Sequence, residues 1–507
     1  MLHQKRFCLF LAIALALCAL PSFAKQASAQ EKNFVMAGYD GDSMQHDWTT
    51  NLFFQRMQEE TGVSFSFQQF TEYEAWTAQK EKYLTGGDLP DVLFKAELTS
   101  LETLTLYENG KLIDVAPLLE EYAPHLYALL EENPSWRKAI TLPDGAIAAL
   151  PAINLIRAQN AMWINQTWLE NLKLDLPTDA ASFKAVLKAF KTQDPNRNGK
   201  KDEIPLAFLG SWDLKYLAHA YGLVANDYNI YADASGKVQF MPASDTFREF
   251  LLWVSGLYDE GLLDQSGFTT ADTLRTITDE KAAAIYGIVM GPTPTVFLPA
   301  AQGEQYVLLQ PLVYGGKQIY RDFVGPVTRG TFAITSACQD PAALLSWVDK
   351  LYTEEGARLA LAGKEGVEYA FDESGNWSWL GNQQTLADVV KNVTICDSGS
   401  IPWYNPVDFQ LQYAQEAPAQ VVANMKRLGE IAVLPYPVVT LTADQEAQIA
   451  PLQSEIGRYV DESIARFVLG EVPLNDETWQ TYKEMLDEMG LKGFVDFWQD
   501  VLNAYSK

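Results

Sequence analysis

The fold of this chain is decided by residues 161–206, which begin Ala161-Met162-Trp163-Ile164-Asn165-Gln166-Thr167-Trp168-Leu169. We expect a strand at the start of this region and a second strand at 204–209. Between them, one face of a predicted helix carries apolar side chains at the i, i+3, i+4, i+7 spacing: Phe183, Val186, Leu187 and Phe190. Thr178 or Asp179 is suited to cap this helix, because a short side-chain oxygen can accept from the free backbone N–H groups of the first turn.

A loop rich in side-chain oxygens follows the helix: Asp194-Pro195-Asn196-Arg197-Asn198-Gly199-Lys200-Lys201-Asp202-Glu203. Calcium takes about six to eight oxygen ligands at roughly 2.3–2.6 Å, and alternate residues of a tight loop can supply them. We predict a structural calcium ion held by the backbone carbonyl of Lys200 and by five side chains: Asp194, Asn196, Asn198, Asp202 and Glu203. An EF-hand would carry Glu at position twelve, where this chain has Pro205, so Asp202 and Glu203 must close the site. The alternative is a solvated double turn without metal.

The size and charge of the chain limit its architecture and its partners. Its 507 residues exceed what one hydrophobic core supports, so two lobes are expected. The net charge of -27 repels phosphate backbones and anionic lipid, which argues against nucleic-acid binding. The same charge weighs against polyuronate ligands, unless the ligand cleft is locally basic.

The first 29 residues are expected to be a signal peptide, with Lys5 and Arg6 preceding an apolar run over 7–20. Export to the outside of the cell or to its surface follows. A lipid anchor at Cys18 is disfavoured, because Leu17 stands where a small residue is needed. Beyond this leader, Cys338 and Cys396 could pair or remain free thiols.

The segment after the leader predicts a parallel α/β unit. A short strand at 34–37 is followed by a helix through Trp48, Phe53 and Met57, which Gly62 ends. Val63, Phe65 and Phe67 then alternate with polar residues, as in a strand. A strand, helix and strand of this length form a βαβ unit.

Several of these motifs together resemble the extracellular solute-binding proteins of ABC sugar importers, family 1. The motifs are "Asn-x-x-Trp-Leu" at 165–169, the oxygen-rich loop, "Asp-Glu-Ile-Pro-Leu" at 202–206, "Asp-Gly-x-x-x-x-x-Pro" at 144–151 and the run 363–369. The chain is most similar to the long, calcium-loop-bearing branch with lipoprotein-type and alginate-binding members. The resemblance implies a periplasmic-binding-protein-like α/β fold with a hinge and an interlobe ligand cleft. Lobe I would comprise 30–150 and 325–390, and lobe II 151–324 and 391–507, with the calcium loop at 194–203.

The function implied by the resemblance is capture of a carbohydrate, an oligosaccharide in the first instance, by hinge closure and its delivery to the membrane subunits of an ABC permease. The protein would act as a monomer and would not be an enzyme. The sequence contains no G-x-S-x-G, H-E-x-x-H, P-loop or G-x-G-x-x-G motif, and His46, His125 and His219 are far apart. Two alternatives remain: a secreted carbohydrate-active hydrolase that uses two carboxylates, and a ligand sensor for a histidine kinase.

We expect ligand contacts at the carboxyl ends of strands, where a parallel sheet places its ligand crevice. Sugars stack their C–H faces on aromatic rings and need polar groups for their hydroxyls. The candidates in the first lobe are Asp40, Trp48, Trp76, Lys95 and Glu97. The candidates in the second lobe are Trp212, Trp403 and Tyr404. Arg321 is a further candidate, because it lies near the return crossing to the first lobe that the resemblance places at 323–335. Trp168, Trp347 and Trp479 lie on apolar helix faces and are expected to pack in the core.

Overall fold

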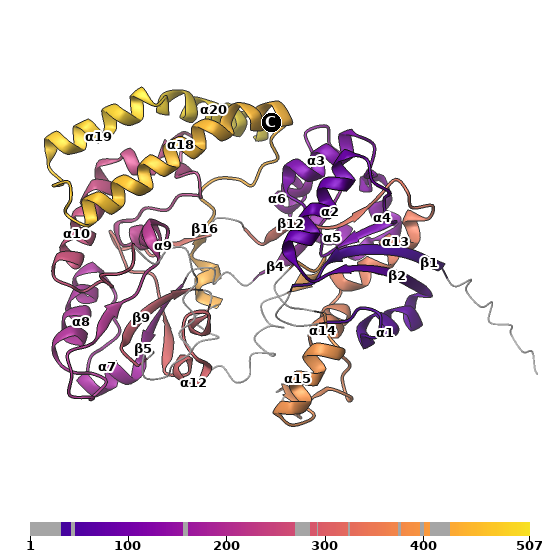
Figure 1. Cartoon of the computed structure of the whole chain (residues 1–507), viewed down its shortest axis with the longest axis horizontal. Coiled ribbons are helices and arrows are strands. Elements are labelled where there is room, and N and C mark those ends of the chain that lie inside the picture. Colours follow the sequence, from indigo (N-terminus) through magenta and orange to yellow (C-terminus); the bar gives the residue numbers. More distant parts are fainter. Residues whose placement is uncertain are drawn as a thin grey trace, which may run out of the picture.

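The chain folds into two bodies that lie side by side and are joined by several crossing segments (Figure 1). The structure is a computed structural model and describes residues 32–41, 46–155, 161–268, 284–291, 293–322, 325–373, 377–395, 400–405 and 426–506. Each body has its own sheet and its own hydrophobic core. The predicted α/β fold with two lobes is therefore confirmed.

The sheet of the first lobe has the strand order β15-β4-β12-β3-β1-β2 among the described residues. Its strands are β1 (Lys32–Tyr39), β2 (Val63–Phe70), β3 (Val92–Phe94), β4 (Leu150–Asn154), β12 (Val327–Ile334) and β15 (Tyr404–Asn405). β1 is parallel to both β2 and β3, and α1 (Leu52–Thr61) connects β1 to β2. Gly62 ends α1 in the left-handed conformation, as predicted, with φ of 71°.

Further helices and a hairpin cover this first sheet. The helices are α2 (Tyr73–Thr85), α3 (Ser100–Glu108), α4 (Leu119–Tyr122), α5 (Pro124–Glu132), α6 (Pro134–Ile140), α13 (Pro341–Asp349), α14 (Glu354–Ala362) and α15 (Gln383–Asn392). The hairpin pairs β13 (Tyr369–Phe371) with β14 (Trp377–Trp379). Trp347 of α13 is fully buried against the phenylalanines of α1 and β3, so its predicted packing role is confirmed.

The second lobe contains a sheet of order β10-β5-β9-β6. Its strands are β5 (Ala161–Asn165), β6 (Ile204–Leu206), β9 (Tyr286–Gly291) and β10 (Tyr306–Leu309). Its helices are α7 (Gln166–Leu172), α8 (Ala180–Thr192), α9 (Gly210–Tyr216), α10 (Asp245–Asp259), α12 (Ala300–Gly303), α18 (Ala443–Val468), α19 (Asp476–Glu488) and α20 (Leu491–Tyr505). Two small pairs complete it: β7 (Ile230–Ala232) with β8 (Val238–Phe240), and β11 (Tyr320–Arg321) with β16 (Ala432–Val433).

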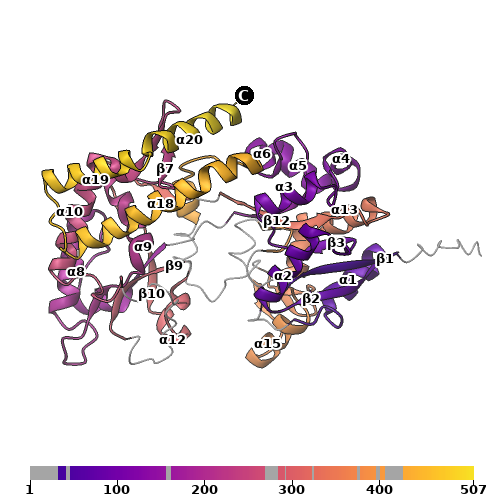
Figure 2. The same ribbon diagram turned by 45° about the horizontal axis from the view of Figure 1, so that its top comes forward.

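The capped helix predicted in the fold-deciding region is α8. Asp179 is its N-cap, and the Asp179 carboxylate accepts from the Ser182 backbone N–H at 2.8 Å. All four predicted apolar positions are buried in the core of the second lobe, where Trp168 and Trp479 also pack. The C-terminal helices belong to this core, and Figure 2 shows them lying across the second lobe with α18 reaching toward the first.

The chain crosses between the lobes at different residues from those expected. β4 belongs to the first sheet through Asn154. β15 pairs with β4 in parallel, so the described residues 400–405 belong to the first lobe and not, as expected, to the second. The reason is packing, because Ile395, Ile401 and Trp403 fill the first core. The predicted leader, Cys18 and Cys396 lie outside the described residues. None of the helices in the described part of the chain has the length and apolarity needed to cross a bilayer.

Candidate ligand-binding site

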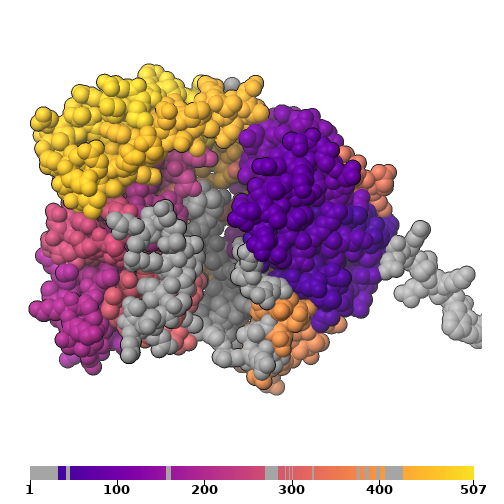
Figure 3. All heavy atoms as spheres, viewed as in Figure 1, coloured from indigo at the N-terminus to yellow at the C-terminus, as the bar shows by residue number. Residues whose placement is uncertain are grey.

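A groove of about 650 Å³ lies where the two lobes meet the segment that leads into α18. The first lobe supplies the turn before α3 and the start of β12, and the second lobe supplies residues 226–228, α18 and α20. In the space-filling view, α18 of the second lobe approaches the first lobe at one edge of the junction (Figure 3). Residues distant in sequence therefore share one concave surface, as ligand sites commonly do.

Aromatic rings form the second-lobe wall of the groove. Tyr228 stacks on Trp498 with ring centroids 5.0 Å apart and an interplanar angle of 20°. Tyr436 meets Trp498 edge-on at 5.5 Å and donates its hydroxyl hydrogen to the Trp498 carbonyl at 2.6 Å. Trp498 and Tyr436 are buried, whereas Tyr228 keeps 38% of its surface exposed. This wall is rigid behind and accessible in front, which suits stacking against a sugar ring.

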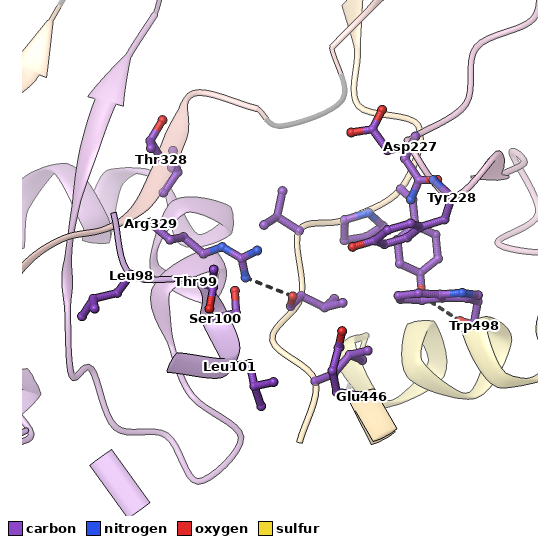
Figure 4. A pocket seen from close by; sticks show the side chains of 17 residues that line it. Leu98, Thr99, Ser100, Leu101, Asp227, Tyr228, Thr328, Arg329, Glu446 and Trp498 are labelled. Carbon is purple, nitrogen blue, oxygen red and sulfur yellow. Dashed lines mark hydrogen bonds between the residues drawn. The ribbon is translucent and has the colours of Figure 1, made fainter. Parts of the chain in front are cut away.

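Charged groups surround the exposed tyrosine. Figure 4 shows Arg329 reaching from the first-lobe side, with Asp227, Tyr228 and Trp498 opposite and Glu446 below. Burial raises the pKa of Tyr228, and the Glu446 carboxylate raises it further, so the hydroxyl remains a proton donor at neutral pH.

Arg329 owes its position to an irregularity in β12. The pairing of β12 with β4 shifts register between Thr328 and Phe332, and such bulges re-aim side chains next to sites. Arg329 Nη1 donates to the Val439 carbonyl at 3.0 Å and to Thr440 Oγ1 at 3.3 Å. Burial lowers the pKa of Arg329 from its very high usual value. The guanidinium thus ties the first lobe to the segment that leads into α18.

A second cavity of about 400 Å³ shares Arg329 with the groove and adds Glu97, Asn154 and Ser400. The turn that carries Glu97 is strained, since Lys95 and Glu97 both have φ of 49°. The Trp76 indole N–H donates to the Ala96 carbonyl at 2.8 Å and supports this turn from beneath.

The backbone opposite this turn must be glycine. Gly330 has φ of 70°, and a Cβ there would lie 2.1 Å from the Leu98 carbonyl oxygen. Glycine therefore lets β12 approach the turn closely enough for the Leu98 N–H to donate to the Gly330 carbonyl at 3.0 Å. This close approach fixes Leu98 and Thr99 at the edge of the groove.

Three predicted contacts of the first lobe do meet, but inside the protein. Lys95 Nζ lies 2.5 Å from Asp40 Oδ1, the Trp48 indole donates to the same carboxylate, and His46 Nδ1 lies 3.1 Å from Asp40 Oδ2. Burial alone would raise the pKa of Asp40, but hydrogen bonds and the charges of His46 and Lys95 hold it below its usual value. We name these four residues the buried cluster; each is at most 4% exposed.

Trp403 and Tyr404, expected in the second lobe, lie in the first, because β15 pairs with β4 and the Trp403 ring packs in the first core. Trp76 and Trp403 are at most 1% exposed, so neither offers a surface for a ligand in this structure. Tyr404 is half-buried in β15. Glu97 is half-buried and lines the second cavity.

Two of the residues predicted in the second lobe, Trp212 and Arg321, do lie in that lobe and connect to the groove. Trp212 begins α9, is 43% exposed and meets Tyr216 edge-on at 4.9 Å. The Arg321 guanidinium lies 4.5 Å from the centroid of the Tyr216 ring. Arg321 Nη2 also lies 2.6 Å from Asp227 Oδ1, and Asp227 lines the groove. These contacts form a continuous path from Trp212 to the aromatic wall.

The main groove residues were not chosen from the sequence. Arg329 lies within the return crossing that the family resemblance identifies, so its position was available as a signal. Tyr228 follows no strand, and Trp498 lies on a C-terminal helix whose apolar spacing predicts only packing. No local pattern identifies either residue as part of a site.

The predicted cation loop is a compact turn held by its own oxygens. Asp194 accepts from the backbone N–H groups of Asn198 at 3.0 Å and Gly199 at 3.1 Å. The Asn198 side-chain amide donates to Asp202 Oδ1 at 2.9 Å. Gly199 has φ of 74°, which explains the glycine at this turn.

Glu203 completes the loop with a buried carboxylate. It is 6% exposed, and Oε1 has no hydrogen-bond partner among the described residues. Burial raises its pKa, and the neighbouring Asp202 and Asp194 raise it further. A cation beside Oε1 would relieve these costs, and this is the local feature that favours a calcium ion. The described residues contain no group of three or more His, Cys, Asp and Glu placed to hold a metal, so amide and carbonyl oxygens would have to contribute.

Two α/β lobes with a groove at their junction are the architecture of a two-lobe binding protein.

Comparison with protein-family models finds no match. The chain is 26% identical over 504 residues to the fructooligosaccharide ABC transporter substrate-binding protein FusA of Streptococcus pneumoniae, covering 90% of this chain and 88% of that protein. It is 34% identical over 373 residues to lipoprotein LipO of Bacillus subtilis, covering 68% and 66%. It is 22% identical over 297 residues to the polygalacturonan/rhamnogalacturonan-binding protein YtcQ of Bacillus subtilis, covering 56% and 57%.

Solved structures share the fold along the same length. A solute-binding protein associated with an HMO-binding ABC transporter of Bifidobacterium longum infantis matches with a TM-score of 0.76 at 20% identity, over 94% of this chain and 99% of that one. An EF-hand mutant of FusA in complex with fructo-nystose matches with a TM-score of 0.71 at 22% identity, over the same shares. The chain belongs to the substrate-binding proteins of ABC transporters.

Proposed function

We propose that this protein captures an oligosaccharide in the groove between its lobes and delivers it unaltered to an ABC permease. The observation that carries the proposal is the exposed face of Tyr228, backed by Trp498 and opposed by Arg329 from the other lobe. Ligand that touches both walls stabilises the form in which both are close, which is how hinge closure is driven. The related protein FusA is a fructooligosaccharide substrate-binding protein, which supports a carbohydrate ligand for this chain.

The ligand experiment is calorimetric titration of the purified protein with kestose, nystose, raffinose, maltotriose and xylotriose, with mass spectrometry of the recovered sugar. Saturable binding of at least one sugar, recovered intact, is expected. Release of smaller sugars would instead support a hydrolase that uses carboxylates such as Asp227 and Glu446, which line the groove. Absence of binding to every sugar would contradict the proposal.

The protein is proposed to be exported, with residues 1–29 removed, and to work as a monomer. The apolar run over 7–20 supports export, as does the lipoprotein among the relatives. Mass spectrometry of the protein recovered outside producing cells would give the new N-terminus, and light scattering would give the mass in solution. A chain retained in the cytosol would contradict export, and a stable dimer would contradict the monomer.

The loop at 194–203 is proposed to hold a structural calcium ion. The partnerless Glu203 oxygen supports this, and an EF-hand mutant of the related FusA has been solved. Calcium at 100 times its dissociation constant stabilises a folded protein by about 2.7 kcal/mol, so chelation should lower the melting temperature. Asp194→Ala should abolish the difference between calcium and chelator. Identical calcium responses of the variant and the wild type would contradict the site.

A further inference from the structure

We infer that the groove selects an uncharged oligosaccharide and rejects uronate chains through its own carboxylates, chiefly Glu446. This inference rests on the proposed function. Family membership does not decide the point, because the named relatives include both fructooligosaccharide-binding and polygalacturonan-binding proteins. The charges of this groove have to decide it.

Carboxylates outnumber cations among the described residues that line the two cavities. Asp227 and Glu446 line the groove, and Glu97 lines the adjoining cavity. Arg329 is the one lysine or arginine in these described linings. The local balance therefore has the same sign as the net charge of -27 of the whole chain. The groove therefore lacks the local excess of positive charge that binding of a polyuronate would require.

The two groove carboxylates differ in how they are compensated. Asp227 is paired with Arg321 at 2.6 Å. Glu446 lies in the first turn of α18, is half-buried, and its side chain forms no ion pair within the described residues. Its charge therefore faces the groove and would repel the carboxylate of a uronate residue stacked on Tyr228.

Arg329 brings one positive charge to these linings, and its Nη1 is already engaged. Nη1 donates to Val439 and Thr440, which hold the wall of the groove. A neutral sugar meets no such repulsion, because its hydroxyls can donate to Glu446 and its ring can stack on Tyr228.

The test compares two forms of one chain, trigalacturonate and its methyl ester, alongside the neutral panel and at one ionic strength. We expect neutral sugars to bind at least tenfold more tightly than free trigalacturonate. Glu446→Gln should narrow this ratio at least threefold. Glu455→Gln makes the same charge change on an exposed part of α18 outside the groove and should leave the ratio unchanged.

The possible outcomes separate the two proposals. Free trigalacturonate that binds as tightly as the neutral sugars would overturn the inference and leave oligosaccharide capture standing. An unchanged ratio in Glu446→Gln would overturn the role of Glu446. Failure of every sugar to bind would overturn both the proposed function and the inference.

Discussion

The buried cluster and the groove are both built from charged and aromatic side chains, but the first is enclosed by protein and the second is open to solvent. In the buried cluster, Lys95, Trp48 and His46 all point at the Asp40 carboxylate and leave almost no surface to solvent. In the groove, Tyr228 and Glu446 face open space between the lobes. The comparison shows that the carboxyl end of a strand locates a polar group but does not decide whether that group meets ligand or protein.

The buried cluster holds together parts of the first lobe that are distant in the sequence. Lys95 Nζ lies 3.4 Å from the Ile395 carbonyl, and His46 Nε2 lies 2.9 Å from the Val390 carbonyl. These contacts attach the end of α15 to the ends of β1 and β3. The groove is instead assembled from both lobes, so its residues should affect binding more than stability.

The largest effect should come from breaking the buried ion pair. Lys95→Met leaves the Asp40 carboxylate buried without its cation, and loss of one partner of a buried pair costs about 3–5 kcal/mol. Urea unfolding measures this free energy. The matched control is Lys32→Met, because Lys32 meets Asp340 at the same 2.5 Å on the surface and should contribute less than about 1 kcal/mol. Equal losses in the two variants would show that burial of the cluster does not matter.

Acid should weaken the same cluster. The folded pKa of Asp40 is lowered, so its contribution to stability is complete above its unfolded value of about 3.9 and is lost as the pH falls through the lower folded value. The loss should therefore occur below about pH 4. Melting temperatures between pH 5 and pH 2.5 test this, and Asp40→Asn should lose less stability over that range than the wild type. A variant with the same acid profile as the wild type would contradict the assignment.

A smaller effect, seen in binding, is expected at the aromatic wall. Tyr228→Ala removes the exposed stacking surface and should weaken sugar binding about tenfold, or about 1.4 kcal/mol. Tyr314 provides a matched control, since it is 42% exposed and stacks on Tyr221 at 5.7 Å away from the groove lining. Tyr314→Ala should leave calorimetric affinity unchanged. A similar loss in both variants would indicate a general effect on folding.

The smallest effect should come from Trp212. It reaches the groove only through Tyr216, Arg321 and Asp227, so Trp212→Ala should weaken binding by about threefold, or about 0.7 kcal/mol. Trp212→Phe should keep most of the affinity because the ring contact with Tyr216 remains. A loss larger than that of Tyr228→Ala would place the sugar on Trp212 and move the centre of the site.

The sequence by itself determined the local elements and the family. The apolar spacing of α8, its Asp179 cap and the βαβ unit at the start of the first lobe were all predictable, because each depends on residues a few positions apart. The turn at Gly199 follows from the same kind of short-range rule. The family motifs predicted two lobes and a binding function without any structural information.

Only the tertiary structure decided which polar and aromatic side chains are accessible. Trp48 and Trp212 both lie near strand ends, but Trp48 is buried against rings from α1, β2 and β3, whereas Trp212 is 43% exposed. The groove unites a strand of the first lobe, a loop of the second lobe and helices near the end of the chain. The exposure of a side chain depends on which segments pack against it. Those segments come from distant parts of the sequence, so no local pattern specifies them.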